Sequence, residues 1–526
     1  MEGDKVTGSS SGLEHAVAKF CLTTAIAYVN AAPHIGHALE FIQADALCRY
    51  HRLKGDETFF LTGTDEHGVK IYEAAQVAGL PTQEFVDQNA KQFMDLKKTL
   101  NLSNDGFVRT TSAHHKAGAQ KIWTKMMEAG DIYKDIYKGN YCVGCEAYVG
   151  EKDLDSEGNC LIHKKKPKAL EEENYFFKLS KYSDKIKKLI QSDELLILPE
   201  SRKNEMLNII GEEGLRDVSF SRPKNVLPWG IDVPGDPDQV MYVWCDALSN
   251  YITAIGYEKE SAAFKKFWPA DVHLIGKDIL RFHAGIWIGM LLSAGLEVPK
   301  AIYVHGFVTS EGQKMSKSIG NVVNPLEYVE KYGTNSLRYY LLKEISTTDD
   351  GDFSQKKFIE LFNSDLANSL GNLVNRVTMM VERYVGGKVP EPTANDEVST
   401  QVGDFMQKYV DAFDVFDLKM ACEALVDLTN FANKYIDDKK PWSVAKNNPA
   451  DLPAILYDLL ELLRYIATLL VPLLPSAAEA IAGQLGLKVA DLKLDSKWGM
   501  LKEGTDIKVT GALFPRIEIP GEEKGH

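Results

Sequence analysis

The sequence predicts an α/β protein in which a parallel sheet is followed by an all-helical domain. Between residues 20 and 110, short apolar runs alternate with stretches that favour helix. This alternation is typical of strand–helix–strand units with a right-handed crossover. From about Phe353 to about Gly486 the strand-like runs give way to helical patterns. A chain of 526 residues is long enough for more than one domain.

The composition is that of a globular protein, with 44% hydrophobic and 25% charged residues. A net charge of −14 argues against a generally basic nucleic-acid coat, although a local basic face is compatible with it. Seven cysteines, an odd and sparse set, argue against a disulfide scaffold and favour a reducing compartment. The most apolar segment, residues 452–474, contains Asp458, Glu461 and Arg464, so it predicts a buried bundle helix and no membrane span. We therefore expect a cytoplasmic protein that begins with a flexible leader over residues 1–17.

The first strand–helix unit begins the predicted sheet. The apolar run over residues 20–28 predicts one buried strand, and residues 38–47 favour a helix that ends near Gly55. Pro33 suits an early helical position, where no backbone hydrogen bond is lost. We therefore expect the residues between the strand and the helix to lie at the carboxyl edge of the sheet.

Two short motifs carry groups that suit a polyphosphate. His34 and His37 are three residues apart, so they share one face at a helix N-terminus, where free N–H groups attract phosphate. Gly36 between them leaves room for a ligand. Nearly three hundred residues later, Lys314 and Lys317 follow a predicted strand over residues 301–308. Each motif alone is more often surface or core than a site, and it is the pair that favours a phosphate site.

Further strands end in groups that could bind a ligand. A strand over residues 57–62 leads to Asp65, which could instead be a helix cap or turn residue. A strand beginning at Val272 leads through Gly276 to Asp278, a carboxylate placed as in nucleotide folds that bind ribose hydroxyls. Because ligands bind outside the carboxyl ends of parallel strands, we expect these groups to face one cleft.

An aromatic stripe follows the apolar run over residues 240–243. Trp244, Ala247 and Tyr251 are spaced at i, i+3 and i+7, which places them on one face of a helix. Such a stripe is more often part of a core than of a pocket.

A region between residues 131 and 220 interrupts the alternation and contains four candidate metal ligands. Cys142 and Cys145, then Cys160 and His163, supply two ligand pairs at a spacing that suits tetrahedral zinc. Four protein ligands would make the metal structural. The alternative is a set of reduced, unpaired thiols.

Together, His34-Ile35-Gly36-His37 and Lys314-Met315-Ser316-Lys317-Ser318 resemble the two signature motifs of class I aminoacyl-tRNA synthetases. The resemblance extends over residues 20–447 and is greatest to the methionyl-tRNA synthetase family. It implies ATP-dependent formation of methionyl-adenylate from L-methionine, followed by transfer to tRNA(Met). It also implies zinc at Cys142, Cys145, Cys160 and His163, although His as the fourth ligand departs from the usual Cys.

The resemblance also assigns roles to individual residues. It implies catalytic roles for His34, His37, Lys314 and Lys317, with Mg²⁺ accompanying ATP. It implies a methionine pocket formed by Ile26, Tyr28, Asp65, Trp244, Ala247, Tyr251, Ile279, Phe282 and His283. It implies ATP contacts from His34, Gly36, His37, Glu40, Gly276, Asp278, Val308, Lys314 and Lys317. It implies anticodon contacts from Asn372, Arg376 and Trp442.

These inferences give a domain plan. We expect a Rossmann-like catalytic domain with a zinc-knuckle insertion and a helical-bundle anticodon domain, divided as follows: leader 1–17, catalytic halves 18–130 and 221–310, insertion 131–220, lysine-loop and stem-contact region 311–355, and helical domain with C-terminal tail 356–526. We expect a monomer with no membrane partner, which could join a multi-synthetase complex in the cell.

Three alternatives stay open. The chain could be another class I synthetase, although it has no large editing insertion such as those specific for leucine, isoleucine or valine carry. It could be another nucleotidyltransferase with a His-x-x-His motif. It could also be a non-catalytic tRNA-binding scaffold derived from a synthetase.

Overall fold

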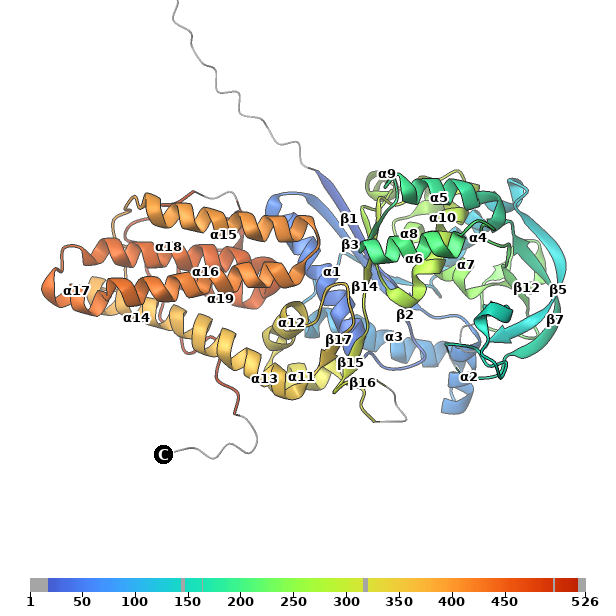
Figure 1. Ribbon diagram of the computed structural model, residues 1–526, viewed down its shortest axis with the longest axis horizontal. Coiled ribbons are helices and arrows are strands. Elements are labelled where there is room, and N and C mark those ends of the chain that lie inside the picture. The colour runs from blue at the N-terminus through green and yellow to red at the C-terminus, as the bar shows by residue number, and fades with distance from the viewer. Residues whose placement is uncertain (1–17, 143–146, 163, 316–319, 495–496, 519–526) are drawn as a thin grey trace, which may run out of the picture.

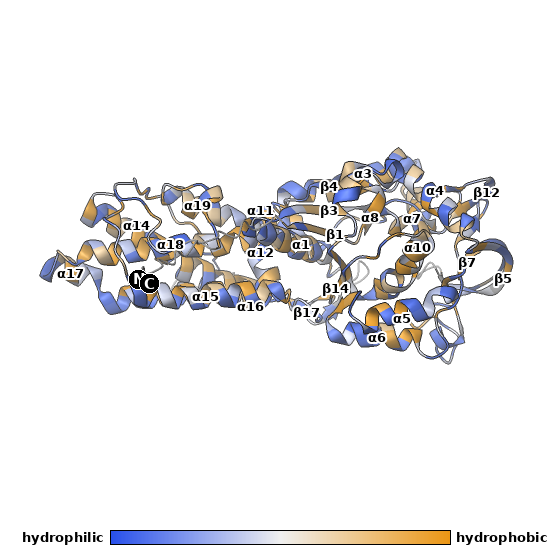
Figure 2. Cartoon of the chain, turned by 90° about the horizontal axis from the view of Figure 1, so that it is seen from above, coloured by the Kyte–Doolittle hydropathy of each residue, from blue (hydrophilic) through white to orange (hydrophobic). Residues whose placement is uncertain are grey.

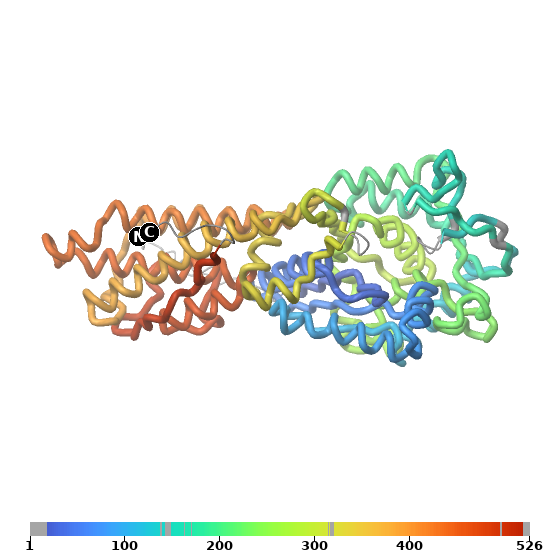
Figure 3. Tube along the Cα trace, turned by 90° about the horizontal axis from the view of Figure 1, so that it is seen from below, coloured from blue at the N-terminus to red at the C-terminus, as the bar shows by residue number. Residues whose placement is uncertain are grey.

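The computed structural model describes residues 18–142, 147–162, 164–315, 320–494 and 497–518. The chain forms two lobes along one long axis, an α/β lobe and a helical lobe (Figure 1). The segment between about residues 320 and 355 lies where the two lobes meet (Figure 3). The change of pattern near Phe353 was therefore a correct prediction of the second lobe.

A seven-stranded sheet forms the centre of the α/β lobe. Its order is β2–β3–β1–β13–β14–β8, with β4 also paired to β3, and every pairing is parallel. The strands are β1 (Lys19–Thr24), β2 (Ala27–Tyr28), β3 (Glu57–Asp65), β4 (Gly106–Arg109), β8 (Leu196–Leu198), β13 (Val272–Gly276) and β14 (Ala301–His305). The predicted parallel α/β sheet is confirmed.

Two predicted strands are each divided in the structure. The run over residues 20–28 forms β1 and β2, because the chain leaves β1 at Thr24 and Ala25 N–H donates to the carbonyl of Leu274. The run over residues 301–308 ends β14 at His305 and continues as β15 (Val308–Ser310). β15 lies in a separate small sheet with β16 (Gln313–Lys314) and β17 (Gly351–Phe353).

Helices pack around the central sheet. The first, α1 (Ile35–Lys54), ends at Gly55, whose φ of 100° is the left-handed conformation expected of a C-cap glycine. α10 (Ile288–Ser293) is mostly hydrophobic along its length (Figure 2). The other helices of the lobe are α2 (Val69–Ala78), α3 (Thr82–Thr99), α4 (Ala113–Glu128), α5 (Ser183–Gln191), α6 (Glu200–Ile210), α7 (Val243–Leu248), α8 (Asn250–Thr253) and α9 (Ala262–Phe267).

The insertion consists of two small antiparallel sheets. One contains β5 (Ile132–Cys142), β6 (Ala147–Val149), β7 (Lys168–Phe177) and β9 (Val218–Ser219), and the other contains β10 (Ser221–Pro223), β11 (Asp232–Val233) and β12 (Asp236–Met241). The range 131–220 does not coincide with these sheets, since β8 lies within it but pairs with β14 in the central sheet. With only three residues, β8 was too short to be recognised as a core strand.

The helical lobe follows the two junction helices α11 (Pro325–Tyr332) and α12 (Thr334–Lys343). α15 and α16 alternate between hydrophilic and hydrophobic stretches, as amphipathic helices do (Figure 2). The lobe consists of α13 (Gln355–Leu361), the π-helical segment η6 (Phe362–Gly371), α14 (Asn372–Val385), α15 (Asp396–Asp414), α16 (Leu418–Lys439), α17 (Pro441–Asn447), α18 (Leu452–Leu473) and α19 (Pro475–Gln484).

The apolar segment over residues 452–474 forms α18, as predicted, and is buried in the bundle. Its Arg464 and Glu461 form a buried ion pair of 2.6 Å. In the described part of the chain, no helix has the length and apolar character needed to cross a membrane. The C-terminal tail packs back on the lobe, because Ile507 and Phe514 are buried and Ile517 N–H donates to Asn363.

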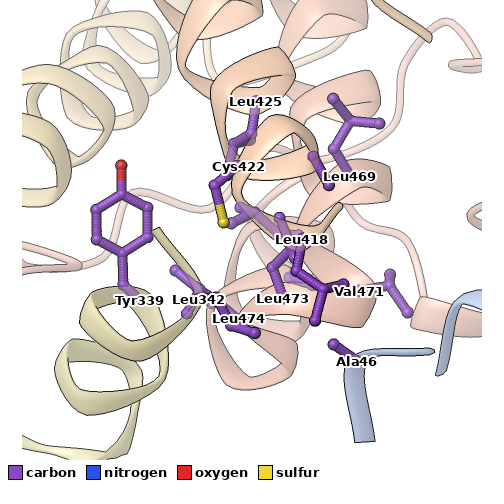
Figure 4. Close-up of a cluster of buried hydrophobic side chains, with 14 of the residues drawn as sticks. Ala46, Tyr339, Leu342, Leu418, Cys422, Leu425, Leu469, Val471, Leu473 and Leu474 are labelled. Carbon is purple, nitrogen blue, oxygen red and sulfur yellow. The ribbon is translucent and has the colours of Figure 1, made fainter. Parts of the chain in front are cut away.

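One hydrophobic core continues across the junction between the lobes. Figure 4 shows Tyr339 and Leu342 of α12 beside Leu418 and Cys422 of α16, with Ala46 of α1 at the edge of the same cluster. The helix that begins at the His34 motif therefore packs directly on the helical lobe.

Candidate active site

His34 and His37 lie at the start of α1, beyond the carboxyl end of β1. His34 is the N-cap residue rather than part of the first turn, so Pro33 precedes the cap and is not an early helical residue as expected. His34 Nδ1 accepts from Gly36 N–H at 3.1 Å, and His37 Nδ1 accepts from His34 N–H at 3.2 Å. With Nδ1 occupied in this way, each neutral imidazole carries its proton on Nε2.

The two imidazoles are close to each other, with ring centroids 3.9 Å apart. Burial, together with the neighbouring His34 and His305, holds the pKa of His37 well below its ordinary value. His37 is therefore neutral near pH 7 and can donate a hydrogen bond from Nε2. A Cβ atom at Gly36 would lie 2.9 Å from Cε1 of His34, so a glycine is needed for this ring position.

A second pair of titratable groups lies behind the histidine motif. His305, at the end of β14, contacts Glu40 of α1 with 3.0 Å between Nε2 and Oε2. Burial raises the pKa of the Glu40 carboxyl. Burial disfavours the charged form of His305, but the hydrogen bond and charge of Glu40 outweigh it and raise the pKa of His305. Position at a strand end could have identified His305 from the sequence, but it was missed.

Gly276 and Asp278 lie at the carboxyl end of β13, in the turn that begins η4 (Lys277–Ile279). A Cβ atom at Gly276 would lie 3.1 Å from Asp278 Oδ1, so glycine lets this carboxylate turn back toward the strand end. Asp278 also lines a cavity of the lobe. The predicted ribose-binding carboxylate thus faces the same cleft as Asp65.

This cavity of about 330 Å³ lies at the carboxyl ends of the central strands. Every residue of the expected methionine pocket lines it: Ile26, Tyr28, Asp65, Trp244, Ala247, Tyr251, Ile279, Phe282 and His283. These residues come from β2 and its preceding turn, β3, α7, α8, η4 and η5 (Phe282–Trp287), so the fold brings together positions spread over 258 residues of sequence. The arrangement favours the pocket interpretation of the aromatic stripe over the core interpretation.

Aromatic rings form one wall of the cavity. Trp244 and Phe282 stack with centroids 3.9 Å apart and an interplanar angle of 6°. Tyr251 Oη lies 2.6 Å from His283 Nε2, and His283 Nδ1 lies 3.0 Å from the carbonyl of Ile279. Burial lowers the pKa of His283 to about 4, so the ring is neutral. Its Nδ1–H donates to the carbonyl of Ile279, and its Nε2 accepts a hydrogen bond from the Tyr251 hydroxyl.

Several other cavity residues were not identified from the sequence: Ala25, Lys70, Ile162, Val243, Leu248, Asn250 and Arg281. Lys70 lies 5.9 Å from the ring centroid of Tyr28, and its position in the first turn of α2, soon after the end of β3, could have suggested it. Ile162 belongs to the insertion and is 63% exposed, yet it lines the cavity mouth. Sequence periodicity cannot predict that contact, because it depends on how the insertion folds over the sheet.

The lysine motif begins at the last residue of β16, in the small sheet formed by β15, β16 and β17. In β16, the backbone of Lys314 pairs with Thr309 of β15. Val308, an expected ATP contact, is buried at the start of β15. Lys317 lies outside the described residues. Beyond the motif, the carbonyl of Val323 accepts from Ile35 N–H at 3.0 Å, which attaches this segment to the start of α1.

The predicted metal ligands are described in part. Cys142 and Cys160 are buried in one cluster with Val149, as two ligands of a common site would be. Cys145 and His163 lie outside the described residues. Within the described ranges alone, no group of three His, Cys, Asp or Glu side chains suited to a metal is found.

The expected anticodon residues lie on the helical lobe. Asn372 is exposed at the start of α14, and Arg376 one turn later forms an ion pair of 3.2 Å with Asp437 of α16. Trp442 is 43% exposed on α17, which follows α16 directly. An exposed indole, an amide and a guanidinium are groups that can stack on or hydrogen-bond unpaired bases.

Sequence profiles of two families match the chain. Residues 20–160 and 151–378 match "tRNA synthetases class I (M)", and residues 386–524 match "Anticodon binding domain of methionyl tRNA ligase". The chain is 44% identical over 511 residues to the methionine--tRNA ligase of Caldanaerobacter subterraneus, covering 96% of this chain and 80% of that protein. It is 42% identical over 519 residues to the methionine--tRNA ligase of Nostoc sp., covering 95% of this chain and 97% of that protein.

Solved structures show the same similarity. The structure of Mycobacterium tuberculosis methionyl-tRNA synthetase in complex with methionyl-adenylate superimposes with a TM-score of 0.90 at 38% identity, covering 95% of this chain and 100% of that one. The apo form of the Mycobacterium tuberculosis enzyme superimposes with a TM-score of 0.85 at 36% identity, covering 96% of this chain and 100% of that one.

Proposed function

Because the chain belongs to the methionyl-tRNA synthetase family of class I aminoacyl-tRNA synthetases, we propose that it activates L-methionine with ATP and transfers the methionyl group to tRNA(Met). The observation that carries this proposal is the cavity, where all residues expected to bind methionine meet beside Asp278 at the carboxyl edge of the sheet. The reaction needs no nucleophilic side chain. The methionine carboxylate attacks the α-phosphorus of ATP, and pyrophosphate leaves.

Catalysis in this proposal consists of positioning and charge stabilisation. The Nε2–H groups of His34 and His37 donate to the phosphate oxygens as negative charge develops in the transition state. Glu40 holds His305 beside this motif, and Asp278 accepts from the ribose hydroxyls. Lys314 and Lys317 hold the leaving pyrophosphate, and ATP enters as its Mg²⁺ complex. Gly276 and Val308 form the remaining contacts with the nucleotide.

Methionine selection follows from the two sides of the cavity. Asp65 pairs with the ammonium group, and Trp244, Phe282, Tyr251 and His283 surround the thioether. The Tyr251 hydroxyl donates a hydrogen bond to His283 in the structure. The hydroxyl oxygen, and not its proton, is therefore available to the side chain of the substrate.

The remaining assignments extend this proposal to tRNA and zinc. Asn372, Arg376 and Trp442 read the anticodon from the helical lobe, whereas the cavity lies in the α/β lobe. The two lobes follow one another along the long axis of the molecule (Figure 1). Cys142, Cys145, Cys160 and His163 hold a structural zinc, and the shared burial of Cys142 and Cys160 supports that set. We place the enzyme in the cytoplasm as a monomer that could enter a multi-synthetase complex.

Methionine-dependent exchange of pyrophosphate into ATP tests the function. We expect exchange with methionine and not with leucine, isoleucine, valine or cysteine. The His37→Asn variant keeps a side-chain oxygen that can accept from the backbone N–H of His34, as Nδ1 of His37 does. It loses the Nε2–H donor, and we expect the rate of exchange to fall about 10²-fold or more. Exchange with another amino acid would favour a different class I synthetase. Absence of exchange from folded protein would favour a tRNA-binding scaffold.

A further inference from the structure

A buried carboxylate joins the two sides of the cavity without lining it. Asp246 of α7 is 1% exposed, and its two oxygens accept from two imidazoles. His67 Nδ1 lies 2.6 Å from Oδ2, and His115 Nε2 lies 2.7 Å from Oδ1. His67 and His115 are themselves buried and come from different elements, the turn after β3 and helix α4. One side chain therefore connects three segments that are distant in sequence.

The same connection reaches a fourth segment. His115 Nδ1 lies 2.8 Å from the hydroxyl of Thr253 on α8. Gly118, one turn after His115, lets α4 and α8 approach closely, since a Cβ there would lie 2.4 Å from Cγ2 of Thr253. An ionised carboxylate has no proton to donate, so His67 donates from Nδ1 and His115 from Nε2.

Each end of this connection is next to a residue that lines the cavity. Asp65 precedes His67 by two residues, Trp244 and Ala247 flank Asp246 in α7, and Tyr251 precedes Thr253 by two residues. One carboxylate therefore links the segment that carries Asp65 to the segments that carry Trp244 and Tyr251.

The charge on Asp246 is retained despite burial. Burial alone would raise its pKa, but the charges and hydrogen bonds of His67 and His115 outweigh this and lower the pKa to about 2. Charge-assisted hydrogen bonds of this kind are shorter and stronger than neutral ones, so they fix geometry as well as contribute energy.

We propose that Asp246, acting through His67 and His115, is a positioning residue that sets the spacing between Asp65 and the Trp244–Tyr251 wall of the methionine cavity. This inference rests on the proposed function. A carboxylate that merely stabilises the fold would affect all ligands equally. A positioning carboxylate affects methionine and leaves ATP binding unchanged.

Calorimetric titration with L-methionine, without ATP, tests the proposal directly. We expect His67→Ala to weaken methionine affinity about tenfold, because Asp246 loses a buried donor and the Asp65 turn is released. His67→Asn should restore most of the affinity, since its amide N–H takes the place of Nδ1–H. The KM for ATP in pyrophosphate exchange should stay within about twofold of wild type.

A double-mutant cycle separates positioning from general destabilisation. If His67 acts through Asp65, the loss in methionine affinity for His67→Ala combined with Asp65→Asn equals that of Asp65→Asn alone. Asp131→Asn is the matched control, because Asp131 is also buried and its partners, Lys181, Tyr182 and Ser293, lie outside the cavity. Its effect on methionine affinity should be small.

Three results would overturn the proposal. The losses in methionine affinity could be additive in the cycle, or His67→Ala could raise the KM for ATP as much as it weakens methionine binding. His67→Asn could also bind methionine no better than His67→Ala at equal melting temperature. If wild-type protein binds methionine and supports exchange, such a result rejects the positioning role alone. If wild-type protein does not bind methionine, the proposed function and this inference fail together.

Discussion

Asp45 and Arg338 form an ion pair of 2.8 Å in which both side chains are 0% exposed. Asp45 lies on α1 and Arg338 on α12, and the guanidinium also donates to the carbonyls of Leu100, Pro472 and Leu473. The pair therefore ties the helix that carries the histidine motif to the C-terminal end of α18 at the junction between the lobes.

Removing one partner of this pair should destabilise the fold strongly. Asp45→Asn leaves a buried guanidinium without its counter-charge, and we expect the free energy of unfolding to fall by about 3 kcal/mol. Urea denaturation measures this change. The control is Asp95→Asn, which breaks the exposed Lys91–Asp95 pair and should cost less than about 0.5 kcal/mol. Similar losses in the two variants would show that the junction pair does not stabilise the fold.

Buried neutral histidines should make stability fall below pH 6.5. The pKa of His283 is lowered from 6.5 to about 4 in the folded state, chiefly by burial, so between these values the unfolded state binds more protons. The free energy of unfolding therefore rises with pH in this window, by about 1.4 kcal/mol per pH unit for one such group. Burial also lowers the pKa values of His37 and His273, so both act in the same direction.

Denaturation at a series of pH values checks this expectation. The side chain in His283→Gln does not titrate, but its oxygen can still accept from Tyr251. Between pH 6.5 and 4, the free energy of unfolding of the variant should therefore depend less on pH than that of wild type, by the contribution of about one proton. The same slope in wild type and variant would mean that His283 is protonated in the folded protein.

Gly36→Ala should reduce activity without reducing stability. The added Cβ would lie 2.9 Å from Cε1 of His34, so the ring must move, whereas alanine in a helix is favoured over glycine by about 1 kcal/mol. A displacement near 1 Å can cost about 10² in rate, which pyrophosphate exchange would measure. Gly403→Ala in α15 is the matched control, since its Cβ meets no atom within 4 Å. Full activity of Gly36→Ala would show that the position of His34 is not critical.

The sequence was sufficient for local structure and strand-end chemistry, and it was less informative about contacts between distant segments. The α1 helix, its Gly55 cap and the buried helix α18 follow from periodicity and capping, which are local. The methionine residues came from the family resemblance, because an aromatic stripe alone does not distinguish a pocket from a core. Asp246, His115 and Arg338 could not be identified, since their charged partners lie 131 or more residues away in sequence and meet only after folding.

The cysteine cluster should contain zinc. Cys142 and Cys160 share one buried cluster, and we expect about one zinc per chain by elemental analysis. Cys160→Ser should remove most of it, because a neutral hydroxyl is a much poorer zinc ligand than a thiolate. Cys422→Ser, buried in the helical lobe, should leave zinc content unchanged. Zinc-free wild-type protein, purified without chelator, would support the interpretation of reduced thiols.

Trp442→Ala should separate tRNA recognition from amino-acid activation. The indole is 43% exposed on α17 and follows Asp437, the partner of Arg376, closely in sequence. α17 lies at the end of the helical lobe that is far from the α/β lobe (Figure 1), which contains the cavity. Stacking of an unpaired base on an aromatic ring contributes about 1–3 kcal/mol, so the KM for tRNA should rise by about 5- to 100-fold. Methionine-dependent pyrophosphate exchange should be unchanged, because that reaction needs no tRNA. Met500→Ala, which also removes an exposed apolar side chain from the helical lobe, should alter neither reaction. If Trp442→Ala slowed exchange as well, the indole would be acting through the shared core on α1 and not through contact with the anticodon.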